Sequence, residues 1–220
     1  MRVVVAGAHG QVARRLGRLL SARGDSAVGI VRDPGHQADL RADGVQPVVL
    51  DLERAGVDDV AAVVEGADAV VFAAGAGPGS GAARKHTVDR GAAVLLADAA
   101  QRAGVRRYLL VSSMGVEQAR QGTPRDMDPV FAAYLEAKLA AEDDILSRPA
   151  LDPVVLRPGR LTDDPGTGRV TLGRGIEFGD VPRDDVAAVL LAFLDSPLNG
   201  TVVELVGGST PIAETVAAVP

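Results

Sequence analysis

Short apolar runs alternate with segments of helical periodicity along most of the chain. The apolar runs are rich in β-branched residues and bounded by glycine, proline or charged side chains, as expected of strands buried on both faces. These predicted strands lie at residues 3–5, 26–31, 45–50, 69–74, 108–112, 154–157 and 201–206. One helix is predicted directly after the first glycines, and further helices are predicted at residues 57–64, 87–103, 130–146, 184–194 and 210–218. This alternation predicts an α/β fold with a doubly wound parallel sheet and helices on both faces.

Irregular segments separate some of these elements, at residues 33–44, 75–81, 117–129 and 159–182. The glycine-rich loop 75–81 follows a central strand, which places it at the carboxyl edge where doubly wound sheets bind ligands. A solvated connector would have the same composition. The turn-rich segment 159–182 is expected to be a small substrate-side insertion, and Asp184 and Asp185 are expected to cap the helix after it. No linker or repeat divides the chain, so we expect a single domain over residues 1–220.

Composition narrows the classes of function. The 220 residues are 47% hydrophobic, which is enough for one sizeable core. The chain has no cysteine, and its three histidines lack metal-ligand spacing, so we expect no metal site. A net charge of −6 with few aromatic residues argues against a nucleic-acid surface, and no apolar run is long enough to cross a bilayer. We therefore expect a cytoplasmic monomer or homodimer with a small-molecule substrate and no membrane or nucleic-acid partner.

The first strand leads directly into closely spaced glycines and then into a helical pattern. Gly7 can turn the chain sharply, Gly10 lets the backbone approach a pyrophosphate, and Ala13 allows the helix to pack closely on its strand. The free N–H groups at the start of that helix would face the anion. An ordinary glycine turn would have the same spacing. The predicted cofactor contacts in this stretch are Gly7, His9, Gly10, Gln11 and Val12.

The residue that follows the second strand distinguishes the two nicotinamide dinucleotides. An aspartate there would bind both ribose hydroxyls of NAD, whereas an arginine can pair with the 2′-phosphate of NADP. Arg32 is the first residue after the apolar run of the second strand, whereas Asp33 precedes Pro34 and is typical of the start of a turn. The arginine therefore favours NADP over NAD. After the third strand, Asp51 is expected to meet the adenine amino group, beside Leu52. Small residues that would line the far side of the adenosine are Ala73, Ala74 and Gly75.

Tyr134 and Lys138 lie four residues apart on one predicted helix, so their phenol and ammonium groups share a face. An ammonium favours the ionised phenol, which would let the tyrosine exchange a proton with a carbonyl or alcohol oxygen near neutral pH. The lysine could also bind the ribose hydroxyls of a nicotinamide cofactor. The chain has only two tyrosines and two lysines, so a tyrosine and a lysine would rarely fall four residues apart by chance. The alternative is a half-buried tyrosine beside a solvated lysine.

Two serines, Ser112 and Ser113, end the fifth strand at the carboxyl edge. A hydroxyl at this position can orient a substrate oxygen beside the tyrosine. We expect Ser113 to do so, with Ser112 as the alternative, because the register is not fixed by the sequence. Both serines could instead satisfy the turn that follows.

These features together resemble the short-chain dehydrogenase/reductase superfamily. The resemblance rests on the glycine-rich opening, the segment 111–113, the spacing of Tyr134 and Lys138, and the segment 155–162. It is to the atypical branch of small NAD(P)-binding proteins, related to epimerase/dehydratase-like proteins, flavin/biliverdin reductase B and NADP-sensing repressors. It implies a Rossmann fold and a cofactor contact at Pro158. The chain departs from the superfamily at Asp89, where the superfamily usually has asparagine. The implied catalytic residues are Ser113, Tyr134, Lys138 and Asp89.

The residues and the resemblance predict an NADP(H)-dependent oxidoreductase that moves a hydride to or from a small carbonyl, alcohol or quinone-like substrate. Tyr134 would be the acid/base, Lys138 its activator and ribose ligand, and Ser113 a donor to the substrate oxygen. The alternative is a non-catalytic NADP(H)-binding redox sensor, because Asp89 changes the charge beside Lys138. A P-loop NTPase is excluded, since the chain has no phosphate-binding motif ending in glycine-lysine.

Overall fold

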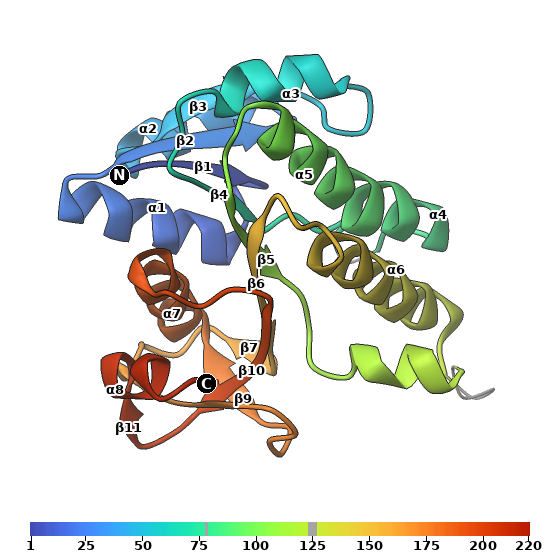
Figure 1. Ribbon diagram of the computed structural model, residues 1–220, viewed down its shortest axis with the longest axis vertical. Helices are drawn as coiled ribbons and strands as arrows, with labels where there is room; N and C mark the ends of the chain where they lie inside the picture. The colour runs from blue at the N-terminus through green and yellow to red at the C-terminus, as the bar shows by residue number, and fades with distance from the viewer. Residues whose placement is uncertain (78, 123–126) are drawn as a thin grey trace.

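The computed structural model describes residues 1–77, 79–122 and 127–220, and it confirms the predicted α/β architecture (Figure 1). Within these residues the main sheet has the strand order β11-β8-β10-β6-β5-β4-β1-β2-β3. All neighbours from β10 to β3 are parallel, whereas β8 is antiparallel to both β10 and β11. The strands are β1 (Arg2–Ala6), β2 (Ser26–Val31), β3 (Gln46–Val49), β4 (Ala69–Phe72), β5 (Arg107–Val111), β6 (Asp152–Pro158), β8 (Arg169–Gly173), β10 (Thr201–Gly207) and β11 (Thr210–Pro211). A separate parallel pair is formed by β7 (Arg160–Thr162) and β9 (Asp180–Pro182).

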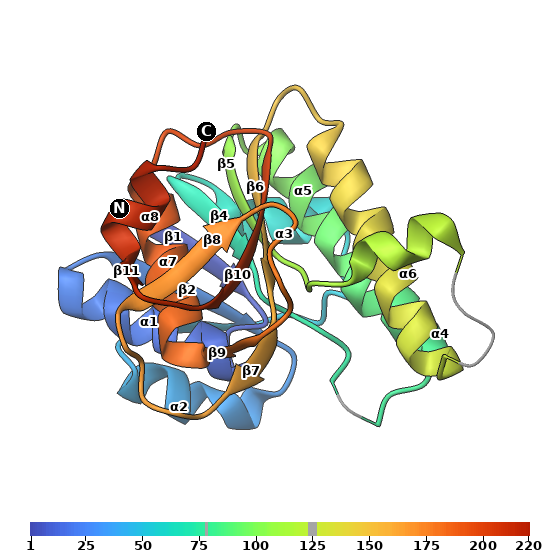
Figure 2. The ribbon, with the colours of Figure 1, turned by 90° about the horizontal axis from the view of Figure 1, so that it is seen from below.

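Helices cover both faces of the sheet, α1 and α7 on one and α3, α5 and α6 on the other (Figure 1). The α-helices are α1 (Gln11–Arg23), α2 (Gln37–Ala42), α3 (Val57–Val64), α4 (Ala82–Arg84), α5 (Ala93–Arg102), α6 (Pro129–Leu146), α7 (Arg183–Asp195) and α8 (Ile212–Ala217). Other helical segments are η1 (Pro34–His36) and η3 (Val116–Gln121), both 3₁₀, and η2 (Lys85–Ala92), which is π-helical. Figure 2 shows α1 and α7 lying side by side, as their contacts also indicate.

The central strand β1 divides its side chains between two apolar cores. Val3 and Val5 belong to the core under α1 and α7, whereas Val4 and Ala6 belong to the core under α3 and α5. All four are at most 2% exposed, because successive side chains of a strand point to opposite faces and both faces are covered. Burial on both sides explains why this strand is apolar at every one of these positions.

Several segments differ from the sequence-based prediction, among them the segment 159–182, which was expected to be irregular and contains β7, β8 and β9. The polar segment 33–44 contains η1 and α2, and α2 was not predicted because Leu40 is its one buried residue. The helix predicted from residue 87 begins earlier, at Ala82, and passes through the π-helical η2 before α5. Its first turns carry the charged residues Arg84 and Lys85, so the apolar period that identifies a helix is missing there.

The predicted caps at the start of α7 are wrong. Pro182 is the N-cap residue, and the carboxylates of Asp184 and Asp185 bond away from the helix. Asp185 accepts hydrogen bonds from the N–H groups of Thr167 and Gly168, at 3.0 and 2.8 Å, and Asp184 accepts one from Gly166 at 3.3 Å. These carboxylates therefore hold the turn before β8 against α7, because that turn has its own unpaired N–H groups.

A buried ion pair links α6 to the sheet. Arg157 on β6 donates to Glu142 on α6 at 3.0 Å, and the two residues are 6% and 0% exposed. A further hydrogen bond of 2.7 Å joins Arg157 to Glu117 on η3. The arginine therefore joins β6 to both α6 and η3.

Replacing Glu142 with alanine should lower the free energy of unfolding by about 3–5 kcal/mol, because it leaves the Arg157 charge buried without its main partner. Urea denaturation followed by circular dichroism measures this loss. Asp58→Ala is the matched control, since it removes an ion pair with Arg102 in which both side chains are exposed, and its effect should be small. Equal effects of the two substitutions would contradict the prediction.

Candidate functional site

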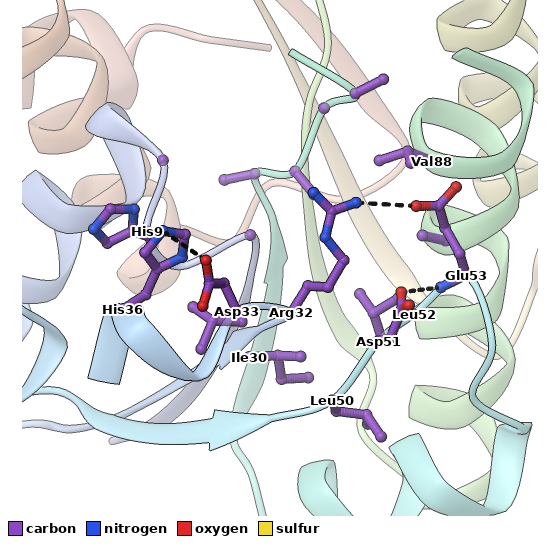
Figure 3. Close-up of a pocket in the computed structure, with 18 of the residues that line it drawn as sticks. His9, Ile30, Arg32, Asp33, His36, Leu50, Asp51, Leu52, Glu53 and Val88 are labelled. Atoms are coloured by element: carbon purple, nitrogen blue, oxygen red, sulfur yellow. Dashed lines mark hydrogen bonds and ion pairs between the residues drawn. The ribbon is translucent and has the colours of Figure 1, made fainter. Parts of the chain in front are cut away.

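A first cavity of about 410 Å³ opens at the carboxyl edge of β1, β2, β3 and β4 (Figure 3). Strand order reverses between β1 and β4, and ligands of doubly wound sheets bind at such a point. The residues that line this cavity and were predicted to bind the cofactor are Gly7, His9, Gly10, Arg32, Asp51, Leu52, Ala73, Ala74 and Gly75. Their common position follows from the parallel topology, which brings the ends of four strands to one edge.

Two glycines of the loop after β1, Gly7 and Gly10, leave little or no room for a side chain at their own positions. Gly7 has a φ of +76°, and a Cβ there would lie 2.5 Å from the Cα of Ala74. Gly10 is the extended N-cap residue of α1, and its own Cβ would lie 3.1 Å from the carbonyl oxygen of Gly7. The loop thus brings bare backbone and the N-terminus of α1 to the cavity, an arrangement that suits an anion.

Arg32 extends across the first cavity toward Glu53 (Figure 3). Its side chain is 56% exposed, and its Nη1 lies 3.3 Å from the Oε2 of Glu53. Glu53 is held more closely by Arg84 and Thr87, each at 2.7 Å, and these hydrogen bonds lower the pKa of Glu53. Arg32 is therefore only loosely held within the described part of the chain. Asp33 instead accepts a hydrogen bond from Gly35 N–H at 2.8 Å, in the turn expected for it.

Two histidines form the wall of the cavity opposite Glu53 (Figure 3). The rings of His9 and His36 stack with their centroids 3.5 Å apart and an interplanar angle of 6°. His9 Nε2 lies 2.8 Å from Asp39, and this contact is the main cause of a lowered pKa of Asp39. His36 was not predicted, because only the tertiary fold brings η1 to the glycine loop.

A second cavity of about 590 Å³ adjoins the first. The two share Gly10 and the segment 73–76, so they form one continuous cleft across the sheet edge. Gln11, Val12 and Pro158, all predicted to contact the cofactor, line this second part. Of the substrate-side insertion predicted at 159–182, Leu161 lines the cavity.

Three predicted catalytic residues meet in the second cavity. Lys138 on α6 is only 4% exposed, and its Nζ donates to the carbonyl oxygen of Val111 at 2.9 Å. The same Nζ lies 3.5 Å from Oδ1 of the fully buried Asp89 and 5.9 Å from the ring centroid of Tyr134. Asp89 also accepts a hydrogen bond from Ala76 N–H at 3.2 Å. Lys138 is therefore not the solvated surface lysine of the alternative interpretation.

The structure brings Ser112 rather than Ser113 to this cavity. Ser112 lines it, is buried, and has a hydroxyl without a hydrogen-bond partner among the described residues. Ser113 donates its hydroxyl hydrogen bond to the carbonyl oxygen of Met114 at 3.0 Å and is not part of the lining. The alternative, in which Ser112 faces the site, therefore fits the geometry, because β5 ends at Val111 and the residue that follows it, Ser112, lines the cleft.

Sequence reasoning missed several charged residues of the cleft. They are Glu53, Arg84, Lys85, Asp128 and Arg183. Lys85 and Arg84 could have been noticed as charged residues next to the glycine-rich loop 75–81, which was already expected at the carboxyl edge. Glu53 and Arg183 carry no comparable local signal.

Comparisons with known proteins agree with this architecture. A family model described as NAD(P)H-binding matches residues 7–197. YhfK of Bacillus subtilis, named an uncharacterized sugar epimerase, is 34% identical over 97% of this chain and 98% of its own length. A Bacillus halodurans structure that bears the name NAD-dependent epimerase/dehydratase is 35% identical, with a TM-score of 0.89 over 99% of both chains. ChuY, an anaerobillin reductase from Escherichia coli O157:H7, is 26% identical, with a TM-score of 0.79 over 94% of this chain and 97% of its own.

No helix of the described residues combines the length and the apolar character needed to cross a bilayer.

Proposed function

The chain belongs to the NAD(P)H-binding family, and on this premise we propose that it is an NADP(H)-dependent oxidoreductase acting on a small carbonyl, alcohol or quinone-like substrate. The observation that carries the proposal is the meeting of Tyr134, Lys138 and Ser112 in a cavity continuous with the glycine loop. A phosphate loop and a proton donor at one sheet edge are what hydride transfer needs.

The residues of the cleft fit a dinucleotide. A Cβ at Gly7 would collide with Ala74, and one at Gly10 would crowd the carbonyl oxygen of Gly7, so the loop presents bare backbone at both positions, which is suited to a pyrophosphate. Arg32 and Asp51 would hold the adenosine half, and Lys138 the ribose on the nicotinamide side. The nicotinamide, when bound, supplies or accepts the hydride.

The protein side chains would handle the proton. Tyr134 donates its hydroxyl proton to a carbonyl oxygen during reduction, or takes one from an alcohol during oxidation. The Lys138 ammonium, whose Nζ lies 5.9 Å from the ring centroid of Tyr134, supplies a positive charge near the group that has lost its proton. The hydroxyl of Ser112, which has no partner within the described part of the chain, would donate a hydrogen bond to the same substrate oxygen and hold that oxygen beside the tyrosine.

A non-catalytic NADP(H) sensor remains a second candidate, and Asp89 is the observation that favours it. Its carboxylate lies 3.5 Å from Lys138, so part of the lysine charge is already balanced. A lysine whose charge is already balanced would stabilise negative charge on a reacting group less strongly. The two candidates differ in turnover, because a sensor would bind the dinucleotide without reducing a substrate.

We expect NADPH to bind more tightly than NADH, because Arg32 can pair with a phosphate that NADH lacks. Arg32→Ala should weaken NADPH binding about 10- to 100-fold and leave NADH binding nearly unchanged, since a charge-assisted pair contributes roughly 1.5–3 kcal/mol. Calorimetric titration of both dinucleotides measures this. Arg102→Ala is the control, because Arg102 lies at the end of α5 outside both cavities. Equal affinities of the unmodified protein for the two dinucleotides would disprove the NADP preference.

A further inference from the structure

The ring of Tyr134 faces two ammonium groups, although the proposed mechanism uses only one. Lys138 Nζ lies 5.9 Å from the ring centroid, and Lys85 Nζ lies 5.5 Å from it. These are the two lysines of the chain. Both line the second cavity, so the position of Lys85 calls for a role of its own.

Lys85 is a buried charge without a counter-ion among the described residues. It is 9% exposed, and its Nζ donates a hydrogen bond of 3.0 Å to the carbonyl oxygen of Gly77. No carboxylate of the described residues lies within 4.0 Å of that Nζ. Burying an ammonium without an opposite charge is costly, which makes an anion in the adjoining cavity favourable.

The other charged groups of the cavity already have partners. Lys138 pairs with Asp89, and Arg183 pairs with Asp163 at 2.9 Å. Asp128 accepts hydrogen bonds from the N–H groups at the start of α6, at 3.0 and 2.8 Å. The uncompensated charge therefore lies at Lys85, beside the proton donor rather than at the loop that would bind the pyrophosphate.

The local backbone supports a functional position for this lysine. Lys85 is the first residue of η2, and π-helical segments occur frequently at functional sites. Four residues later on the same segment, Asp89 meets Lys138. The segment thus contributes two charged side chains to the second cavity: Lys85, which has no counter-ion among the described residues, and Asp89, which is paired with Lys138.

We propose that Lys85 binds a carboxylate of the substrate while Tyr134 and Ser112 bind its carbonyl oxygen, an inference that rests on the proposed oxidoreductase function. A single ammonium suits one carboxylate charge, whereas a phosphate dianion would call for further unpaired cations. The substrate is then a carbonyl compound, or the matching alcohol, that carries a carboxylate group.

Two probes of nearly equal shape test the charge requirement. They are 4-carboxybenzaldehyde and its neutral analogue 4-formylbenzamide, and each is reduced to its benzyl alcohol with one NADPH and one proton consumed. The unmodified protein should show a kcat/KM about 10- to 100-fold higher for the carboxylate, as expected of a charge-assisted hydrogen bond. A ratio near one would overturn the proposal.

Two variants separate this role from simple support of the loop. Lys85→Gln keeps a donor for the Gly77 carbonyl but loses the charge, so the preference for the carboxylate should disappear. Lys85→Arg keeps the charge and should retain most of the preference. Should Lys85→Gln lower kcat/KM for both probes alike, or should it leave the preference intact, Lys85 is not the carboxylate ligand.

A binding measurement keeps this test independent of turnover. Calorimetric titration of the NADP⁺-loaded protein with the two product alcohols, 4-(hydroxymethyl)benzoate and 4-(hydroxymethyl)benzamide, should show tighter binding of the benzoate, and Lys85→Gln should remove the difference. If neither aldehyde is reduced but the benzoate binds preferentially, the proposed reaction fails and the carboxylate site stands. Equal or undetectable binding of the two alcohols would overturn the carboxylate site.

Discussion

Tyr134→Phe should lower the rate of carbonyl reduction by about 10²- to 10⁴-fold while NADPH binding persists, because the substitution removes only the proton donor. The phenyl ring keeps its place against Phe131, whose ring centroid lies 5.9 Å away, so the cavity wall should be preserved. The assay follows NADPH absorbance with a panel of aldehydes, ketones, quinones and flavins. Calorimetry measures cofactor binding of the same variant.

The chain offers a matched control in its second tyrosine. Tyr108 is fully buried on β5, and its hydroxyl donates to the carbonyl oxygen of Ala93 at 2.9 Å, away from both cavities. Tyr108→Phe should cost stability, roughly 1 kcal/mol for one hydrogen bond, without changing turnover. Full activity of Tyr134→Phe would overturn the assignment of Tyr134 as the proton donor, whereas a panel without any reducible member would favour the sensor.

Gly10→Val should abolish the binding of both NADPH and NADH while the fold persists. The valine Cβ would lie 3.1 Å from the Gly7 carbonyl oxygen and 3.6 Å from that of Ala73, so its methyl groups would occupy the space beside the loop. That space is the expected position of the pyrophosphate, which both dinucleotides share. Circular dichroism checks the fold, and calorimetry measures binding.

Gly56→Val is the corresponding control. Gly56 is also an extended N-cap glycine, at the start of α3, and a Cβ at this position would make only an ordinary contact of 3.5 Å with Asp59. Gly56 lies outside both cavities, so this variant should bind NADPH normally. Normal NADPH binding by Gly10→Val would show that the phosphate loop has been placed at the wrong residues.

The parallel sheet could be predicted from the sequence because its strands are buried on both faces. In β2, for example, five of the six residues are buried, so the strand appears as an unbroken apolar run. Gly7 and Gly10 were equally accessible to prediction, since a backbone position without space for a side chain requires glycine. Constraints of this kind act on a short run or on a single residue, so one amino-acid sequence is enough to show them.

The parts of the site that escaped prediction depend on tertiary contacts. Whether Ser112 or Ser113 faces the cleft depends on where β5 ends, and a shift of one residue exchanges the two. His36 and Glu53 reach the first cavity from segments with no periodic signal. Lys85 was overlooked because a lysine in a polar stretch is normally solvated, whereas in the folded chain it begins η2 and is buried.

The packing of α1 against α7 has a consequence for biosynthesis. Leu16 and Leu20 of α1 share one core with Leu190 and Phe193 of α7, which follow about 170 residues later. A nascent chain emerges from the ribosome N-terminus first, so α1 is made long before its packing partner exists. The apolar side of α1 therefore stays uncovered by α7 until about 170 further residues have been made, and this face of the sheet closes only then.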